Sequence, residues 1–362
     1  PYVIRSLYFD DIDDSAYYDK VAGVMARDKY RTLGIDTDAV INTLSKLRIS
    51  LCCPDGNTEY LCKAADKAFS YLPVRRKLTL SPHHADDRST ASPQSFQQWV
   101  DWARESDAGI DLLVPCRQQA FSSILSDTAQ SAVSEAINLR RLGEYFGKAL
   151  SVKSIISFCF DSQPRNDINP LAAAARTCTS LDTLFSDPIA PAVALDALLS
   201  RGNDSELPVG YAVRNNKAVS VYADESAINR IPALLMYTDE LSLIFRDDKN
   251  VSQIAKLLVR SSILGRVHIT IAPSSAPCGI TAAWIMLARS VIKALLNAML
   301  EPSEALKRLE LTDDHISVAA IAEELEGYPC KQIWDQLLVF SGVGGSWLKD
   351  IKKFEGECAN GK

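Results

Sequence analysis

Some segments of this chain are short apolar runs, and others have apolar residues at the spacing of a helix. The two kinds of segment alternate along the chain, which predicts strands separated by helices. Short runs of aliphatic and β-branched residues, bounded by turn-forming residues, are typical of buried strands. The segments between them have apolar residues three and four positions apart, as in amphipathic helices. The predicted strands are 47–53, 77–81, 109–114, 154–160, 218–222, 240–245 and 266–272. The predicted helices are 94–106, 127–150, 190–200, 226–239, 251–264 and 279–300.

This order of elements indicates an α/β fold, in which a parallel sheet is covered by helices. Seven strands are one fewer than a closed (β/α)8 barrel requires. The place for the missing fifth strand is 200–212, SRGNDSELPVGYA, which has turn residues where a buried strand needs valine or isoleucine. We therefore predict a TIM-type barrel whose fifth strand is degenerate or missing. The charged helical pattern of 301–362 predicts an extension packed outside the barrel.

Composition and charge exclude several classes of function. A hydrophobic content of 47% with 23% charged residues is ordinary for a globular protein. The net charge of −6 argues against a nucleic-acid-binding surface, which needs clustered positive charge. Arg289 and Lys293 interrupt the most apolar helix, so we expect it to pack in the core and not to span a membrane. The charged N-terminal run does not resemble a signal peptide, and we expect a cytoplasmic protein.

The chain has nine cysteines, an odd number scattered through apolar runs. We interpret them as reduced core residues and not as a disulfide framework. The alternative is a zinc site formed by Cys52, Cys53 and Cys62. Adjacent cysteines of a strand point to opposite faces, and neither a CxxC motif nor a nearby histidine completes four ligands, so the pattern disfavours zinc.

Six stretches of the sequence, distributed along most of the chain, are distinctive enough to compare with known families: LGIDTDAV, AGIDLLVPC, RRLGEYFGKAL, AAWIMLAR, IKALLNAMLEPSEALKRLE and GGSWLKDIKKFE. In these stretches the chain from about Thr32 to Glu357 resembles the bacterial L-rhamnose isomerase family. The resemblance implies a (β/α)8 barrel over 32–300, with the extension of 301–362 packed on it. It also implies an enzyme that interconverts L-rhamnose and L-rhamnulose with Mn²⁺ and Zn²⁺ or Co²⁺, and a homotetramer.

The same resemblance shows substitutions at the strand ends, where the family holds its metals. Carboxylates and imidazoles that bind a divalent metal cannot be replaced by apolar or cationic side chains. We therefore expect no metal at the family positions, and Mn²⁺ or Zn²⁺ only if a different site has formed. Metal-binding positions of the family are occupied here by Tyr222, Ile244, Lys249 and Ala272. Other family residues are replaced by Cys52, Pro54, Ser81, Gln119 and Ala120.

Four acidic residues at predicted strand ends are candidate catalytic groups or cation ligands: Asp161, Glu206, Asp224 and Asp247. Asp247 matches one aspartate of the family's metal pair, and Glu206 is the acid nearest to the family's glutamate on the weak fifth strand. Each has an alternative structural role. Asp161 precedes Ser-Gln-Pro and fits a turn, and Asp224 and Asp247 fit helix caps.

Histidines offer a further set of candidates. His268 lies in the middle of a predicted strand among apolar neighbours, and we interpret it as a core histidine and not as a general base. His83 and His84 in SPHHADD could bind a metal with Asp86 or Asp87, although a solvated loop is the favoured interpretation.

Residues 1–31 have a different resemblance. IRSLYFDD and RDKYR are similar to the opening of the VTC-type polyphosphate polymerase domain, a triphosphate-tunnel fold. The resemblance implies that RDKYR begins a strand and that Arg5, Lys29 and Arg31 bind phosphate. Because 31 residues cannot close such a tunnel, a terminal hairpin or helix with solvated charges is favoured.

Three hypotheses about function follow. The first is an L-rhamnose-isomerase-like barrel that has lost metal-dependent isomerase activity and has a non-catalytic carbohydrate-binding or regulatory role. The second is an active aldose–ketose isomerase with a rebuilt metal site. The third is a polyphosphate-linked role of residues 1–31. A small carbohydrate and further copies of the chain are the expected partners, with no nucleic acid and no membrane.

Overall fold

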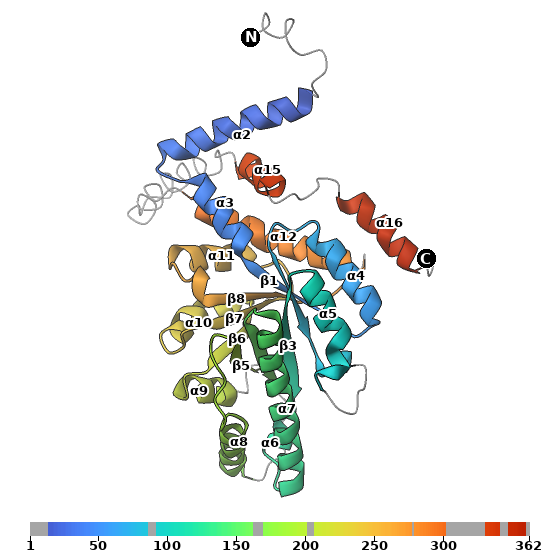
Figure 1. Cartoon of the computed structure of the whole chain (residues 1–362). Coiled ribbons are helices and arrows are strands. Elements are labelled where there is room, and N and C mark those ends of the chain that lie inside the picture. Colours follow the sequence, from blue (N-terminus) through green and yellow to red (C-terminus); the bar gives the residue numbers. More distant parts are fainter. Residues whose placement is uncertain are drawn as a thin grey trace, which may run out of the picture.

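The computed structural model describes residues 14–85, 92–161, 169–200, 206–276, 279–301, 330–340 and 347–359. Within these ranges, eight parallel strands form a closed barrel in chain order, and the last strand pairs with the first (Figure 1). The strands are β1 (Arg48–Cys52), β2 (Arg75–Leu80), β3 (Gly109–Cys116), β4 (Ser154–Phe160), β5 (Ala194–Ser200), β6 (Ala218–Tyr222), β7 (Leu241–Phe245) and β8 (Val267–Ile271). The prediction of a (β/α)8 barrel is confirmed.

Helices follow most strands and cover the outer face of the barrel. Those of the barrel are α3 (Thr37–Lys46), α4 (Thr58–Phe69), α5 (Gln97–Glu105), α6 (Gln118–Phe121), α7 (Ser126–Leu150), α8 (Pro170–Leu184), α9 (Glu206–Arg214), α10 (Glu225–Leu235), α11 (Val251–Arg260) and α12 (Ile280–Met299). Three more helices lie outside this ring: α2 (Asp14–Thr32), α15 (Cys330–Phe340) and α16 (Trp347–Ala359).

The main hydrophobic core lies between the outer face of the strands and the helices. On β7, for example, Leu241, Leu243 and Phe245 point outward into this core. By length and composition α12 could cross a membrane, but 61% of its most apolar window is buried inside the protein. It packs against α11 and α4, so its apolar residues belong to the barrel core.

The inside of the barrel is lined by smaller and more polar side chains than the core outside it. The hydroxyl oxygens of Ser50 and Thr79 lie 2.7 Å apart, and those of Ser157 and Ser220 lie 2.9 Å apart. These four residues are buried. Since large branched side chains usually fill a barrel of this kind, the small residues leave space above them at the carboxyl ends of the strands.

Two predictions about the region of the fifth strand were wrong. We predicted a helix over 190–200 and a degenerate strand within 200–212, but β5 is a complete strand at Ala194–Ser200 and α9 begins at Glu206. β5 pairs with β4 along its whole length. Its sequence, ALDALLS, also fits a helix, in which Asp196 would lie on the surface. In the barrel Asp196 is instead 3% exposed and accepts hydrogen bonds from Arg140 Nε at 3.0 and 3.1 Å.

The resemblance to the polyphosphate polymerase domain implied that RDKYR begins a strand, and this prediction was wrong. These residues are helical, and Tyr30 among them is 1% exposed. Lys29 and Arg31 lie on the exposed side, where Arg31 pairs with Asp28 at 2.9 Å. Neither residue lies in a tunnel of strands. Arg5 falls outside the described residues.

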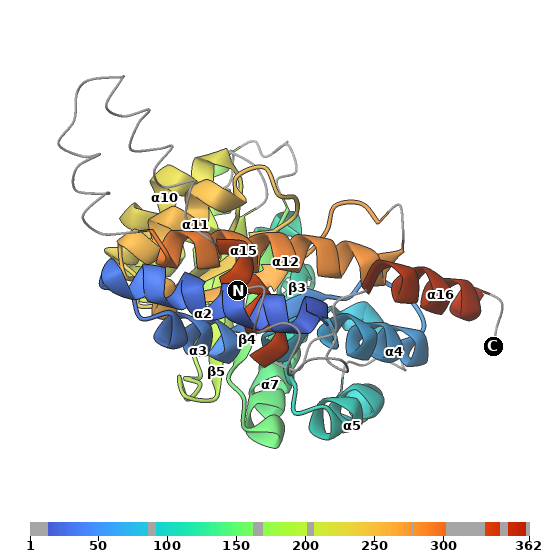
Figure 2. The ribbon, with the colours of Figure 1, turned by 90° about the horizontal axis from the view of Figure 1, so that it is seen from above.

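The outer helices are tied to the barrel by hydrogen bonds between distant parts of the chain. Arg27 Nε of α2 donates to Gln336 Oε1 of α15 at 2.7 Å. Glu355 of α16 accepts from the backbone N–H of Thr281 at the start of α12 and from the hydroxyl of Tyr60 on α4. In Figure 2, α2 runs in nearly the same direction as α12, and α16 lies near one end of α12; α15 contacts both α2 and α12. The helix α2 is continuous through residue 31 and packs against α3 and α15.

Charged side chains are concentrated at the amino-terminal opening of the barrel, and several of them pair with one another, whereas Nη1 of Arg48 there is buried without a hydrogen-bond partner. Lys77 Nζ lies 2.5 Å from Asp111 Oδ1, and both side chains are buried. His268 Nε2 lies 2.5 Å from Glu240 Oε2, and Lys153 pairs with the same carboxylate. This geometry agrees with the interpretation of His268 as a structural residue.

The buried pair of Arg140 and Asp196 generates a first prediction. Asp196→Ala leaves the buried guanidinium without its carboxylate and close to Lys217, whose Nζ lies 3.7 Å from Asp196 Oδ2. We expect it to lower the free energy of unfolding by about 3–5 kcal/mol. Asp187→Ala is the matched control, because it breaks the exposed pair of Asp187 and Arg141 and should cost less than about 1 kcal/mol. Urea denaturation followed by circular dichroism measures both. Equal effects of the two variants would show that β5 does not depend on the buried pair.

The Glu240 carboxylate generates a second prediction, on acid stability. Its hydrogen bond with His268 lowers the pKa of Glu240 to about 2, and Lys153 adds to this against the effect of burial. Because the pKa is lower in the folded protein than the ordinary value of about 4.3, this stabilisation is present above that value and is lost as the pH falls toward 2. Glu240→Gln should therefore reduce the fall in melting temperature between pH 5 and pH 3. Glu105→Gln, at an exposed position, is the control, and identical pH profiles of the two variants would contradict the prediction.

Candidate functional site

A cavity of about 320 Å³ opens at the carboxyl ends of the strands, on the barrel axis. We call it the barrel-mouth cavity. Its described lining includes Cys52 at the end of β1, Thr79 of β2, Ser157 of β4 and Thr270 of β8. This face is where barrel enzymes of this class carry their catalytic residues, because each strand delivers its last side chains and its loop there.

The side chains at the rim follow from the two-residue alternation of the strands. Tyr222, Ile244 and Ala272 are each two positions beyond an inward-facing residue of β6, β7 or β8, so they also point toward the axis. They line the same cavity, where Ile244 packs in an apolar cluster with Tyr222 and Ala272. The structure thus brings together three of the positions at which the resemblance implies replaced metal ligands.

Arg246 is the one charged residue in the described lining of the barrel-mouth cavity. It directly follows Phe245, the last residue of β7, and continues the inward series of Ser242 and Ile244. Its guanidinium carbon lies 5.3 Å from the centroid of the Tyr222 ring. Our sequence reasoning missed Arg246, although the alternation in LSLIFR places it on the inward face.

A second cavity of about 330 Å³ adjoins the first and shares Tyr222, Ile244, Arg246 and Ser274 with it. We call it the outer cavity. It is lined by the loops that follow β6, β7 and β8, and it contains the remaining replaced position, Lys249. The two cavities form one continuous candidate site, in which Arg246 occupies the junction.

Two candidate acids lie in the outer cavity, and backbone groups engage both. Asp224 is the N-cap of α10 and accepts hydrogen bonds from Ala227 N at 3.2 Å and Ser226 Oγ at 2.6 Å. Asp247 accepts from the backbone N–H of Lys249 at 3.2 Å. The structure therefore shows the predicted capping role for Asp224. Asp247, for which a helix cap was also predicted, instead bonds to the backbone of its own loop, and Asn250 is the N-cap of α11.

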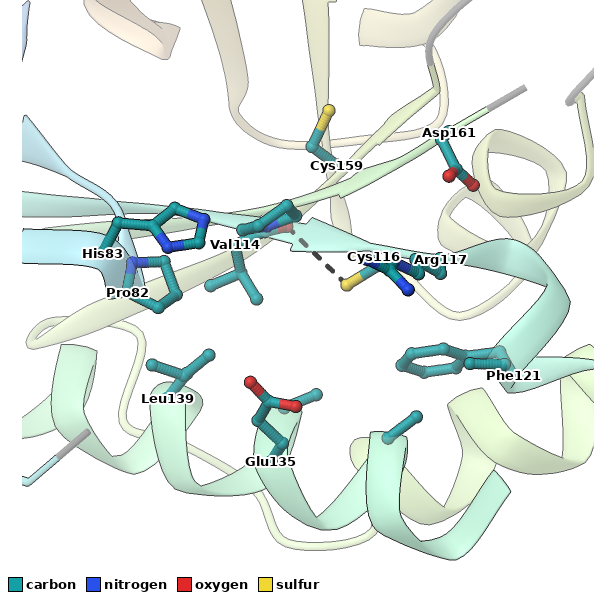
Figure 3. A pocket seen from close by; sticks show the side chains of 14 residues that line it. Pro82, His83, Val114, Cys116, Arg117, Phe121, Glu135, Leu139, Cys159 and Asp161 are labelled. Atoms are coloured by element: carbon teal, nitrogen blue, oxygen red, sulfur yellow. Dashed lines mark hydrogen bonds between the residues drawn. The ribbon is translucent and has the colours of Figure 1, made fainter. Parts of the chain in front are cut away.

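The other candidate acids are not brought to this site. Asp161 accepts from the backbone N–H of Gln118 at 3.0 Å and lines a separate cavity of about 470 Å³. This cavity, shown in Figure 3, shares no lining residue with the barrel mouth. In it Glu135 of α7 points toward the ends of β3 and β4, with His83 to one side. Glu206 begins α9, and its side chain lies outside the described part of the structure.

The two adjacent histidines separate from each other. His84 is 5% exposed, with Nε2 2.9 Å from the carbonyl oxygen of Pro54 and Nδ1 3.0 Å from Ser81 Oγ. Its ring contacts Trp99 edge to face. These contacts make His84 a structural residue, whereas His83 is exposed. Asp86 and Asp87, their suggested partners in a metal site, lie outside the described residues.

The cysteines do not form a metal site in the described part of the chain. Cys52 lines the barrel mouth, whereas Cys53 is buried. Burial raises the pKa of the Cys53 thiol well above its usual range and that of Cys62 to about 12, so neither is a ready thiolate ligand. Among the described residues, no three histidine, cysteine, aspartate or glutamate side chains lie close enough to hold a metal ion.

The described lining of the barrel mouth does not fit a catalytic Mn²⁺, Co²⁺ or Zn²⁺. Such ions require carboxylate or imidazole ligands. The lining instead offers hydroxyl groups, the Cys52 thiol, the Tyr222 ring and a guanidinium. A fixed positive charge at this place repels a divalent cation. We therefore derive no reaction step through a metal.

Comparison with known proteins identifies the scaffold. A family model for L-rhamnose isomerase (RhaA) matches residues 56–361. The L-rhamnose isomerase of Listeria monocytogenes serotype 4a (strain HCC23) is 26% identical over 402 residues, covering 91% of this chain and 96% of that protein. The L-rhamnose isomerase of Pectobacterium carotovorum subsp. carotovorum (strain PC1) is 26% identical over 407 residues, covering 93% and 97%.

Solved structures similar to this one include sugar epimerases. A D-psicose 3-epimerase from Clostridium cellulolyticum H10 covers 70% of this chain with 13% identity and a TM-score of 0.48. An L-ribulose 3-epimerase covers 74% of this chain with 11% identity and the same TM-score. The family model extends through the barrel and the C-terminal helices, and on this match the chain belongs to the L-rhamnose isomerase family.

Proposed function

We propose that this member of the L-rhamnose isomerase family binds a carbohydrate at the barrel mouth without carrying out metal-dependent aldose–ketose isomerisation. The observation that supports the proposal is the lining of the cavity, where Arg246, Tyr222, Ile244 and Ala272 occupy the rim. Isomerisation by hydride shift needs cations that polarise both sugar oxygens and stabilise the developing charge. The described rim offers no carboxylate for such cations.

The same cavity has features that suit a small polyol. Its volume of about 320 Å³ is at the lower end of the range of small-molecule sites. The hydroxyl group of Thr270 can donate and accept hydrogen bonds, and those of Thr79 and Ser157 keep capacity for a further bond beside the ones they make with Ser50 and Ser220. A cytoplasmic homotetramer remains a prediction from the resemblance to the family.

An active sugar isomerase with a rebuilt metal site is the second candidate function, and the names of the curated relatives favour it. Its ligands would come from Asp161, Glu206, Asp224 and Asp247. Asp224 and Asp247 share the outer cavity, but both are hydrogen-bonded to backbone groups there. Asp161 lies in a different cavity. The geometry therefore supports the first proposal better.

The metal content of the purified protein separates these two functions. After dialysis against Mn²⁺, Co²⁺ and Zn²⁺ and removal of free ions, we expect well below one metal ion per chain by elemental mass spectrometry. We also expect no conversion of L-rhamnose above that of a mock purification from the same host. The L-rhamnose isomerase of Listeria monocytogenes, treated in parallel, is the positive control. Stoichiometric metal with turnover that Asp247→Ala abolishes would overturn the proposal and establish a rebuilt site.

Asp224 provides an independent test of the capping role. Asp224→Ala should lower the free energy of unfolding by about 1 kcal/mol, because α10 loses its N-cap. Asp224→Asn should cost much less, since asparagine caps a helix as well as aspartate does. Metal retention should be the same in both variants and in the wild type. A loss of bound metal in either variant, with stability unchanged, would instead identify Asp224 as a ligand.

A further inference from the structure

We infer that the ligand of the barrel mouth is anionic, a sugar derivative whose carboxylate or phosphate group binds to Arg246. This inference rests on the proposed carbohydrate-binding function and names the class of ligand. Its starting point is position: Arg246 lies at the junction of the barrel-mouth and outer cavities and lines both of them. A ligand in either cavity therefore meets the guanidinium.

The contacts of Arg246 hold it in place without neutralising it. Its carbonyl oxygen accepts a hydrogen bond from Ser274 N at 3.0 Å, and Ala272 N donates to the carbonyl oxygen of Phe245 at 2.8 Å, so the ends of β7 and β8 are joined. The side chain lies over the Tyr222 ring. Throughout the described residues, no hydrogen bond or ion pair joins the guanidinium to another protein group.

An arginine in this state is suited to an anion. A guanidinium presents several N–H donors in a planar fork that matches a carboxylate or phosphate. A contact with the face of Tyr222 orients the plane of the group but leaves its edges, where the N–H bonds lie, available. Other arginines of the protein are neutralised by a carboxylate, as Arg140 is by Asp196.

The charges around Arg246 also favour an anion. In the described lining of the barrel-mouth cavity no acid opposes it. In the outer cavity Lys249 adds a second cation, while Asp224 and Asp247 already accept hydrogen bonds from backbone N–H groups. The outer cavity also contains Asn250, the residue at which α11 begins, so the partial positive charge of that helix end lies on the same side.

The two parts of the site suggest how such a ligand would lie. The deeper wall carries the hydroxyl groups of Thr79, Ser157 and Thr270, which suit the hydroxyl groups of a sugar. The rim carries Arg246, which suits a charged group at one end of the molecule. A neutral sugar would leave the guanidinium without a partner of opposite charge, whereas a sugar acid or sugar phosphate would supply one.

Isothermal titration calorimetry tests the inference with four probes: L-rhamnose, the aldonate of the same sugar, its phosphate ester and inorganic phosphate. We expect the aldonate or the phosphate ester to bind at least tenfold more tightly than L-rhamnose, and more tightly than inorganic phosphate. Which of the two binds identifies the anionic group. Raising the salt concentration should weaken this binding and leave that of L-rhamnose nearly unchanged.

Variants assign the preference to Arg246. Arg246→Gln should remove the tenfold difference between anionic and neutral probes, and Arg246→Lys, which keeps the charge but not the planar fork, should retain part of it. Arg230→Gln is the matched control, because Arg230 is exposed on α10 and lines neither cavity. Melting temperatures equal to that of the wild type establish that each variant is folded.

Other results would contradict either the anionic ligand or the carbohydrate-binding function. Equal affinities for neutral and anionic sugars, or a preference that survives in Arg246→Gln, would overturn the anionic ligand and leave the proposed carbohydrate-binding function intact. Inorganic phosphate binding as tightly as the sugar anions would overturn sugar recognition. Binding of none of the four probes would overturn both proposals.

Discussion

In a closed parallel barrel each strand side chain points either into the barrel or outward against the helices, and this two-residue alternation governs the whole molecule. On β7, Leu241, Leu243 and Phe245 point outward into the hydrophobic core. The intervening Ile244 and the following Arg246 belong to the barrel mouth. One short run of residues therefore contributes both to stability and to the candidate site, and a shift by one residue would exchange the two sets.

The two openings of the barrel use charge in different ways. At the amino-terminal opening, Lys77 is paired with Asp111, and Glu240 with His268 and Lys153, so these pairs stabilise the fold, whereas Nη1 of Arg48 there is buried without a hydrogen-bond partner. At the carboxyl-terminal opening, Arg246 contacts an aromatic ring and no carboxylate among the described residues, and it lines both cavities of the candidate site. A charge that the protein does not itself neutralise, at the face where barrels of this kind bind their ligands, is available to a ligand.

Membership of a family does not by itself determine the chemistry of a site. The outward-facing residues and the helices are constrained by a densely packed core, where a change of even one methylene group costs stability. The residues at the ends of the strands line cavities on one side, so they are less closely packed than the core. Tyr222 and Ala272 are partly exposed there, and Ile244 packs against both, so this layer can differ between relatives while the scaffold remains recognisable.

Local periodicity in the sequence determined most of the elements, including seven of the eight strands and the long helices α7 and α12, because burial on one face repeats at a fixed spacing. The capping role of Asp224 could also be anticipated, since its position before a helix is a local property, whereas the same prediction was wrong for Asp247, three residues before the N-cap of α11. Only the tertiary structure decided that ALDALLS is a strand, because its pattern fits both periods and its pair with Arg140 joins residues 56 apart in the chain. Only the tertiary structure placed Arg246 against Tyr222 and separated Asp161 from Asp247. Such contacts depend on which strands are neighbours in the closed barrel, and no local pattern specifies the distance between side chains of different strands.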